Sequence, residues 1–251
     1  MKTIQLIGTR NKSDFTLFLG YLLTKLDKRV LVVDTTQQEV YKNAYSRLNE
    51  GQNLYDFHDI DILSGATNWL EVEELLREVG ESSTSYDTII VDMDLVSIVS
   101  NEWPPFEERY YIGDNDRFNQ MRDVDLLHRL FDVTDSTEMK RVTFKTSYRL
   151  TTDYFDNLMN NRVTWRSMNY VVEPDEFGLG LRIQMGHEQM IPYGKVNKQY
   201  KEILQEIVSE IYQLHIKEVQ SAGKTSFFKF NKSTEKVKKE KRELAVANSN
   251  S

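Results

Sequence analysis

The 251-residue chain contains no cysteine and only four prolines. The lack of cysteine excludes a disulfide framework and any metal site built on thiolates. No apolar run approaches the roughly 20 residues that a membrane-spanning helix needs, and the first residues lack the apolar segment of a signal peptide. From these absences we expect a soluble intracellular protein, cytoplasmic in location.

The sequence also lacks a residue pattern typical of a histidine metal site or of a hydrolase. Its four histidines show no ligand spacing, and no Ser-His-Asp or paired-carboxylate arrangement stands out. Asp59 and Asp61 favour a solvated strand start over a metal site. The histidines are His58, His128, His187 and His215.

Charge is distributed unevenly along the chain. Residues 223–251 carry eight Lys or Arg against three acids, a net charge of +5, so the remaining residues sum to −12 of the total of −7. An acidic body repels polyanions, and we therefore expect any attraction to DNA or anionic lipid to come from the basic segment 223–243.

The first 34 residues predict a strand, a tight turn, a helix and a second strand. Residues 2–7 form an apolar strand, and a turn begins at Gly8. Residues 13–26 carry apolar side chains at helical spacing, with Ser13 placed to cap the first turn. Val30–Asp34 is an apolar strand that ends in a carboxylate. The turn of such a βαβ unit lies at the carboxyl edge of a parallel sheet, where many nucleotide-binding folds hold phosphate.

The remaining chain continues the alternation of strands and helices. A surface excursion is predicted from Trp103-Pro104-Pro105 to Asp116, and Ile191-Pro192-Tyr193 is predicted to close a strand. Further strands are predicted at 61–65, 86–92, 141–145, 168–172 and 181–185, and helices at 41–48, 69–79, 124–131, 154–159 and 200–219. We expect one α/β domain over 1–222, a mostly parallel sheet flanked by helices on both faces, and a basic, flexible tail over 223–251.

Two aspartates and a Lys-Ser pair carry a resemblance to the ParA/MinD family of deviant P-loop ATPases. Lys12-Ser13 opens a helix, and Asp34 follows Lys12 by 22 positions at the end of the next strand, where the family has its catalytic aspartate. The stretch Tyr86-Asp87-Thr88-Ile89-Ile90-Val91-Asp92 is similar to the family's Walker B strand. Ile191-Pro192 resembles the strand end beside the adenine pocket.

The resemblance implies a P-loop NTPase-like fold and a set of site residues. Gly8, Arg10, Lys12, Ser13 and Pro192 would contact ATP. Ser13 and Asp92 would hold Mg²⁺, and Asp34 would position the attacking water.

The phosphate loop departs from the family's pattern. Only three residues separate Gly8 from Lys12, fewer than in the family, and none of the three is glycine. A nest of backbone amides around a phosphate needs glycine at the turning positions. Asp94 stands where many members carry proline. These departures predict that a wrapped triphosphate is difficult to hold.

Each of these residues has a second interpretation that involves no nucleotide. Lys12 and Ser13 are also explained as a solvated turn residue and a helix cap, and Asp34 as a cap for the turn after its strand. In the tail, Phe227, Phe228 and Phe230 beside lysines fit a membrane interface, a solvated tail or a docking contact equally.

The resemblance leads to two main hypotheses for function. In the first, the protein is a degenerate positioning or assembly scaffold for a larger machine, such as a pilus, secretion, conjugation or partition system. It would act without efficient hydrolysis and require no cofactor, and the CpaE/TadZ branch is the nearest functional analogy. In the second, it is an active Mg-ATPase that drives partition or localisation through nucleotide-dependent dimerisation. Protein partners, a homodimer and a tail contact at the inner face of the membrane or on DNA are the expected interactions.

Overall fold

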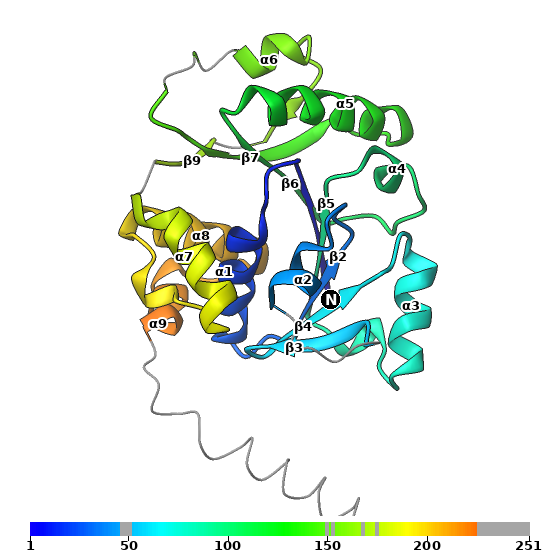
Figure 1. The fold of residues 1–251 in the computed structure, drawn as a ribbon, viewed down its shortest axis with the longest axis vertical. Helices are drawn as coiled ribbons and strands as arrows, with labels where there is room; N and C mark the ends of the chain where they lie inside the picture. Colours follow the sequence, from blue (N-terminus) through cyan, green and yellow to red (C-terminus); the bar gives the residue numbers. More distant parts are fainter. Residues whose placement is uncertain (46–51, 149–150, 152–153, 167–168, 174–175, 225–251) are drawn as a thin grey trace, which may run out of the picture.

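A mostly parallel β-sheet crosses the molecule (Figure 1). The computed structural model describes residues 1–45, 52–148, 151, 154–166, 169–173 and 176–224. The strands of this described part are β1 Lys2–Ile7, β2 Val30–Asp34, β3 Leu54–Phe57, β4 Ile60–Ser64, β5 Thr88–Met93, β6 Glu108–Asp114, β7 Glu138–Phe144, β8 Thr164–Trp165 and β9 Tyr170–Val172. Their order is β3-β4-β2-β5-β1-β6-β7-β8, and β9 also pairs with β7. Only the β3–β4 pair is antiparallel among them.

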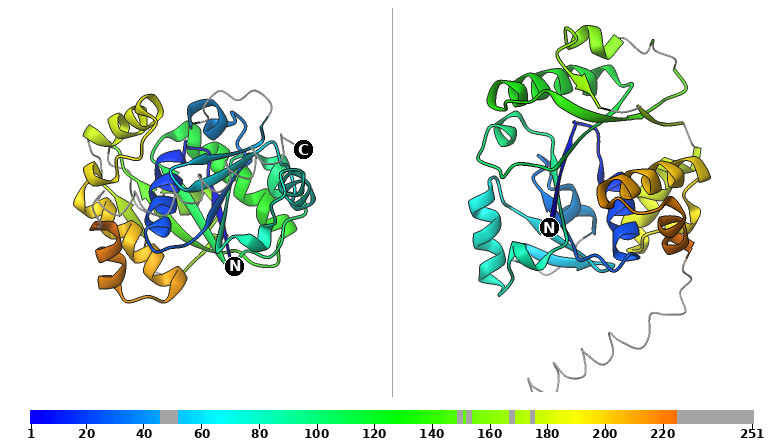
Figure 2. Two further views of the ribbon diagram at one scale, coloured as in Figure 1. Left: turned by 90° about the horizontal axis from the view of Figure 1, so that it is seen from below. Right: turned by 180° about the vertical axis from the view of Figure 1, so that it is seen from behind.

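Helices cover both faces of the sheet, as Figure 2 shows from two further directions. The helices are α1 Ser13–Thr24, α2 Val40–Tyr45, α3 Trp69–Glu78, α4 Val96–Val99, α5 Arg117–Val133, α6 Tyr154–Leu158, α7 Glu176–Glu188, α8 Lys198–Tyr212 and α9 Ile216–Lys224. Two short 3₁₀ turns, Ser83–Ser85 and Tyr193–Lys195, complete the described elements. The expected α/β architecture is therefore confirmed.

The central strands are apolar throughout because each face of the sheet has its own core. Successive side chains of a strand point to opposite faces. In β2, Val30 and Val32 face α1 and α8, whereas Leu31 and Val33 face α3. The first core also contains residues of α2, α7 and α9, and the second contains residues of α4, α5 and α6.

The two carboxylates that end the predicted strands come together at one edge. β2 and β5 are adjacent and parallel, and Asp34 pairs in register with Asp92. The β1–α1 turn lies at the same edge, because β1 pairs in parallel with β5 on its other side. The sequence thus predicted correctly that the Lys12 turn and the two aspartates lie at the same edge of the sheet.

The predicted surface excursion up to Asp116 is wrong. Residues 108–114 form β6, a strand inside the sheet between β1 and β7, with Tyr110, Tyr111 and Ile112 buried. The chain joins β1 directly after the prolines, where Glu107 N–H donates to the carbonyl of Thr3 at 3.0 Å. Flanking charges and two tyrosines masked this strand, since tyrosine is common in strands although its hydroxyl is polar.

The predicted strand at 181–185 is also wrong, because this segment lies in α7. Its alternation of apolar and polar residues fits a strand, but Leu181 and Met185 are also four positions apart, which places them on one helix face. Both are buried, whereas Ile183 between them is 52% exposed. Ile191-Pro192-Tyr193 closes no strand either: it is a turn that leads into the 3₁₀ turn Tyr193–Lys195.

The predicted helix at 200–219 is divided in two. α8 ends at Tyr212, the C-cap residue Gln213 has a left-handed φ of +52°, and α9 begins at Ile216. The apolar stripe continues across this break, so periodicity alone did not reveal it. The predicted division at residue 223 stays a prediction, since α9 runs to Lys224 and 225–251 lie outside the described residues.

No described helix combines the length and the apolar composition that crossing a membrane would require.

The buried position of Ile112 in β6 and the exposed position of Ile183 in α7 predict different losses of stability when each is replaced by alanine. Ile112→Ala removes a fully buried side chain and should lower the free energy of unfolding by about 2–5 kcal/mol. Ile183→Ala, at a half-exposed position of α7, is the matched control and should change it by no more than about 1 kcal/mol. Urea unfolding measures both. Equal small effects would show that residue 112 is not part of the core.

Candidate functional site

The loop between β1 and α1 is fixed by packing on both sides. Gly8 has a φ of +146°, and a Cβ at this position would overlap the carbonyl oxygen of Ile112 on β6. Glycine is required here by the approach of a neighbouring strand. The backbone N–H and the hydroxyl of Thr9 both donate to Asp123 Oδ1 at 2.7 Å, which ties the loop to α5.

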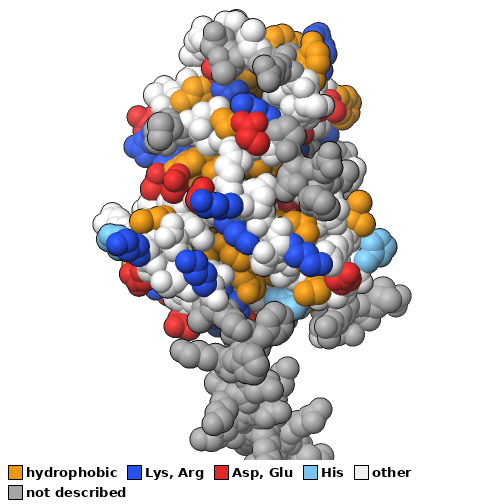
Figure 3. Space-filling model, turned by 90° about the vertical axis from the view of Figure 1, so that its left-hand side faces the viewer, with side chains coloured by type: hydrophobic (Ala, Val, Ile, Leu, Met, Phe, Trp, Pro, Cys, Tyr) orange, Lys and Arg blue, Asp and Glu red, His pale blue; other side chains and the backbone are white. Residues whose placement is uncertain are grey.

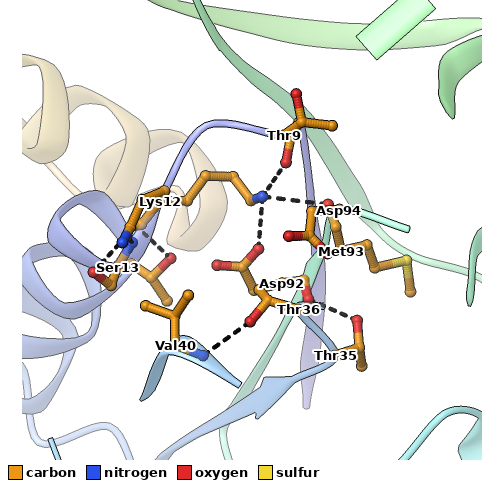
Figure 4. A network of polar contacts seen from close by, with 12 residues as sticks. Thr9, Lys12, Ser13, Thr35, Thr36, Val40, Asp92, Met93 and Asp94 are labelled. Atoms are coloured by element: carbon orange, nitrogen blue, oxygen red, sulfur yellow. Dashed lines mark hydrogen bonds and ion pairs between the residues drawn. The ribbon is translucent and has the colours of Figure 1, made fainter. Parts of the chain in front are cut away.

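Lys12 turns into the molecule and binds Asp92 (Figure 4). Its Nζ lies 2.9 Å from Asp92 Oδ1, and both side chains are 1% exposed. The ammonium also donates to the carbonyl oxygens of Gly8 and, at 3.3 Å, Met93. The ammonium thus contacts three oxygens of its own chain, one through the ion pair and two through hydrogen bonds. Lys12 is therefore neither a solvated turn residue nor free to receive a phosphate in this conformation.

Tyr41 of α2 engages the other oxygen of the same carboxylate. Its hydroxyl donates to Asp92 Oδ2 at 2.5 Å, and Tyr41 is fully buried. Burial raises the pKa of Tyr41 well above its ordinary value, so the hydroxyl stays protonated and remains a donor. Sequence analysis placed Tyr41 in a helix but gave no sign of this contact.

Ser13 is the first residue of α1, and the predicted cap is wrong. The N-cap position belongs to Lys12, whose side chain makes no capping bond. Asn11 Oδ1 accepts from both the N–H and the hydroxyl of Ser13, at 3.0 Å and 2.7 Å. The Ser13 hydroxyl also lies 3.0 Å from the hydroxyl of Tyr45.

Asp34 makes capping contacts at the start of α2. One carboxylate oxygen accepts from the N–H and hydroxyl of Thr36, at 3.0 Å and 2.6 Å, and the other accepts from Tyr41 N–H at 3.0 Å. The pKa of Asp34 is raised to about 6: burial raises it most and the charge of Asp92 adds to the rise, while the hydrogen bonds from Thr36 and Tyr41 lower it.

Arg10 points away from Lys12 and toward β7. Its guanidinium carbon lies 3.6 Å from the ring centroid of Phe144, and Nη2 pairs with Asp14 at 3.3 Å. Arg10 thus lies at the border of two cavities, one beside Lys12 and the other beyond Phe144.

The cavity beside Lys12 is small. It has a volume of about 60 Å³, enough for a few waters and well below the roughly 300–1,000 Å³ of typical ligand pockets. Asp94, on its wall, accepts from Gln37 N–H at 2.8 Å, and burial raises the pKa of its carboxyl. Pro192 is absent from the described walls of this cavity and of the one beyond Phe144.

The structure therefore brings several of the predicted site residues together beside Lys12 and places others elsewhere. Lys12, Ser13 and Asp92 line one small space, with Gly8 behind Lys12. Asp34 pairs in register with Asp92 but lies outside the described wall of this space. Two residues that sequence analysis missed complete the arrangement: Tyr41 and Asp123. The only available signal for Asp123 was its place on a helix after β6, a strand that was itself mispredicted.

The chain is similar to the cell division protein MinD of Aquifex aeolicus, with 11% identity, a TM-score of 0.55 and coverage of 86% of this chain and 98% of that one. The MinC:MinD complex of the same organism gives 12% identity, a TM-score of 0.53 and coverages of 85% and 95%. The chain thus has an α/β fold like that of these structures.

A further similar structure contains a nucleotide analogue. It is a protein assigned to plasmid partition in Borrelia burgdorferi B31, bound to AMPPNP, with 12% identity, a TM-score of 0.53 and coverages of 85% and 99%. No protein-family model matches the chain, and no curated protein matches it by sequence. Identities this low show a common fold, and function has to be argued from the site.

The Lys12–Asp92 pair should behave as a coupled unit. Lys12→Met or Asp92→Asn alone leaves a buried partner uncompensated and should cost about 3–5 kcal/mol of unfolding free energy. The double variant should cost less than the sum of the two, by about 1–3 kcal/mol. Urea unfolding of the four proteins gives this difference, and additive losses would show that the two groups do not interact.

Asp34 should make the protein less stable as the pH rises from about 4 to about 6. Its pKa is near 3.8 in an unfolded chain and about 6 in the fold, so the folded state binds more protons in this interval. The loss attributable to Asp34 is about 3 kcal/mol, at about 1.4 kcal/mol for each pKa unit. Asp34→Asn should remove this part of the slope.

The measurement is urea unfolding of the wild type and the Asp34→Asn variant at several pH values between about 4 and 7, the interval that contains the shifted titration. The pH dependence of the difference between the two free energies is the readout, because any contact that the substitution weakens at every pH contributes only a constant offset. Parallel pH profiles would contradict the raised pKa.

Proposed function

We propose that this protein is a positioning or assembly factor with a ParA/MinD-like fold that works without efficient ATP hydrolysis. The observation that carries this proposal is the buried ion pair between Lys12 and Asp92. The lysine of the phosphate loop is bound by its own chain, at three acceptors, in the place where a nucleotide would need it.

The other residues of the site support the same conclusion, because they do not fit Mg²⁺ and ATP as they stand. Both oxygens of Asp92 are engaged, by Lys12 and Tyr41. The hydroxyl of Ser13 contacts Asn11 and Tyr45. The space between these groups is about 60 Å³. A metal or a triphosphate would have to displace several of these contacts together.

The activities of structurally similar proteins support the class of function that we propose. One acts in cell division, one is assigned to plasmid partition, and one is complexed with a second protein, MinC. For this chain we propose contacts with protein partners of a larger assembly, a homodimer among them, made by its surface. The CpaE/TadZ branch stays the nearest analogy, and the basic segment 223–243 is the proposed contact with anionic lipid or DNA.

An active Mg-ATPase is the competing function. Two features favour it: the register of Asp34 with Asp92 at the carboxyl edge, and a similar protein that binds AMPPNP. In that case Lys12 would leave Asp92 for the phosphates, Ser13 and Asp92 would hold Mg²⁺, and Asp34 would orient water. The two functions differ in whether Lys12 contributes to nucleotide binding.

Titration calorimetry with ATP and Mg²⁺ separates them. We expect a flat titration for the wild-type protein, which at high protein concentration limits the affinity to a Kd weaker than roughly 1 mM. Lys12→Met should give the same result. Lys198→Met, at a side chain that is 91% exposed, is the matched control for the loss of one lysine.

Wild-type binding that disappears in Lys12→Met and persists in Lys198→Met would refute the proposal and support the ATPase. Nucleotide released from the purified, heat-denatured wild-type protein would argue the same way.

A further inference from the structure

The short helix α2 contacts all three of the residues that the resemblance assigned to Mg²⁺ and water. The hydroxyl of Tyr41 donates to Asp92, and the backbone N–H of Tyr41 donates to Asp34 at 3.0 Å. One helical turn further along, the hydroxyl of Tyr45 lies 3.0 Å from that of Ser13. A single helix therefore supplies a partner for each of the three residues, through two tyrosines that are four positions apart.

Both tyrosines are buried on the side of α2 that faces the site. Tyr41 is fully buried and Tyr45 is 2% exposed. Their ring centroids lie 6.3 Å apart, and the ring of Tyr45 also packs against Phe57 of β3 at 5.2 Å. Burial raises the pKa of both hydroxyls, so both stay protonated. Two neutral hydroxyl groups of the chain itself thus contact Asp92 and Ser13.

The opposite side of α2 is packed loosely. A groove of about 370 Å³ lies between α2 and α7, with Ala44 on one wall and Ile183 and Gly186 on the other. Val40 borders this groove and also the space of about 60 Å³ beside Lys12. Figure 1 shows α7 on the left of the molecule, and Figure 3 shows that side, where hydrophobic side chains reach the surface between Lys and Arg side chains. Helix α2 therefore separates a small space on one side from a larger one on the other.

The hydrogen bonds of α2 are stronger on the site side. There the hydroxyl of Tyr41 donates to a carboxylate, and hydrogen bonds to charged groups are about twice as strong as those between neutral groups. On the groove side, Gln189 Nε2 donates to the carbonyl oxygen of Ala44 at 3.0 Å, a bond between neutral groups. Loss of the site-side bonds would therefore leave α2 free to move toward α7.

We propose that α2 is an internal plug, which keeps the space beside Lys12 closed and opens by moving into the groove toward α7. The anchors of the plug are the hydroxyls of Tyr41 and Tyr45, because the backbone bond to Asp34 is available to any residue at position 41 except proline. This role of α2 rests on the function proposed above, since it explains why Lys12 and Asp92 stay bound to their own chain.

Titration calorimetry with ATP and Mg²⁺ on tyrosine-to-phenylalanine variants tests the plug. Each substitution keeps the ring and removes one anchoring hydroxyl, which should raise the population of the open form about tenfold. A nucleotide that binds only the open form gains the same factor in apparent Kd. We expect the double variant, Tyr41→Phe with Tyr45→Phe, to bind with a Kd below roughly 0.1 mM, at least tenfold more tightly than the wild type.

Tyr110→Phe is the matched control for the loss of a buried hydroxyl. Tyr110 is fully buried, and its hydroxyl has no hydrogen-bond partner among the described residues, so this variant should titrate as the wild type does. Lys12→Met added to the double variant should abolish the new binding. Urea unfolding of each variant shows that it is folded, and a merely structural role of the tyrosines would lower stability without creating any binding.

The direction of the movement is tested by filling the groove. Ile183→Trp places a larger side chain on the α7 wall, and in the double variant it should weaken the new binding about tenfold because α2 has less room to open. Leu70→Trp, at a 68% exposed position of α3, is the control and should leave the binding unchanged. Equal binding with and without Ile183→Trp would overturn the movement toward α7.

A flat titration of the double variant, or binding that Lys12→Met does not remove, overturns the plug. The proposed function is decided separately, by the wild-type titration. If the wild type and the double variant are both flat, the function stands and the plug fails. If the wild type binds and the double substitution tightens that binding at least about tenfold, the function fails and the plug stands.

Discussion

The arrangement at the carboxyl edge of the sheet depends on one ion pair between Lys12 and Asp92. Both groups are removed from water, and an isolated charge in such a place is costly to maintain. Each compensates the charge of the other. Two backbone carbonyls accept from Lys12, and the Tyr41 hydroxyl donates to Asp92. The pair connects the β1–α1 loop to β5, and the bond from Tyr41 to Asp92 connects β5 to α2.

The loop is also held from the opposite side. Thr9 donates twice to Asp123, and Tyr111 of β6 donates to the second oxygen of the same carboxylate at 2.8 Å. The loop from Gly8 to Lys12 is therefore connected to strands on both sides of β1. A loop bound this way is already in a low-energy state, and any ligand that requires a different path has to break contacts in two directions.

The sequence predicted the frame of the site well because the frame is local and periodic. β1, β2 and β5 are apolar runs, the last two carrying a carboxylate at or near the end, and parallel pairing brings those ends together. Contacts between distant segments were beyond this reasoning. Lys12 and Asp92 were assigned to phosphate and metal, and no pattern indicated that they would bind each other across 80 positions. Likewise, β6 was hidden by tyrosines, and Gln213 adopts a left-handed conformation without a glycine to reveal it.

The short strands at the ends of the sheet limit how this protein can associate. Among the described strands, β3 at one end has four residues, and β8 and β9, which both pair with β7 at the other end, have two and three. Edges this short offer few free backbone groups on which another chain could add a strand. Higher-order structures of this protein would accordingly be held together by side chains of helices and loops, so their stability would respond to surface substitutions and to salt more than to backbone pairing.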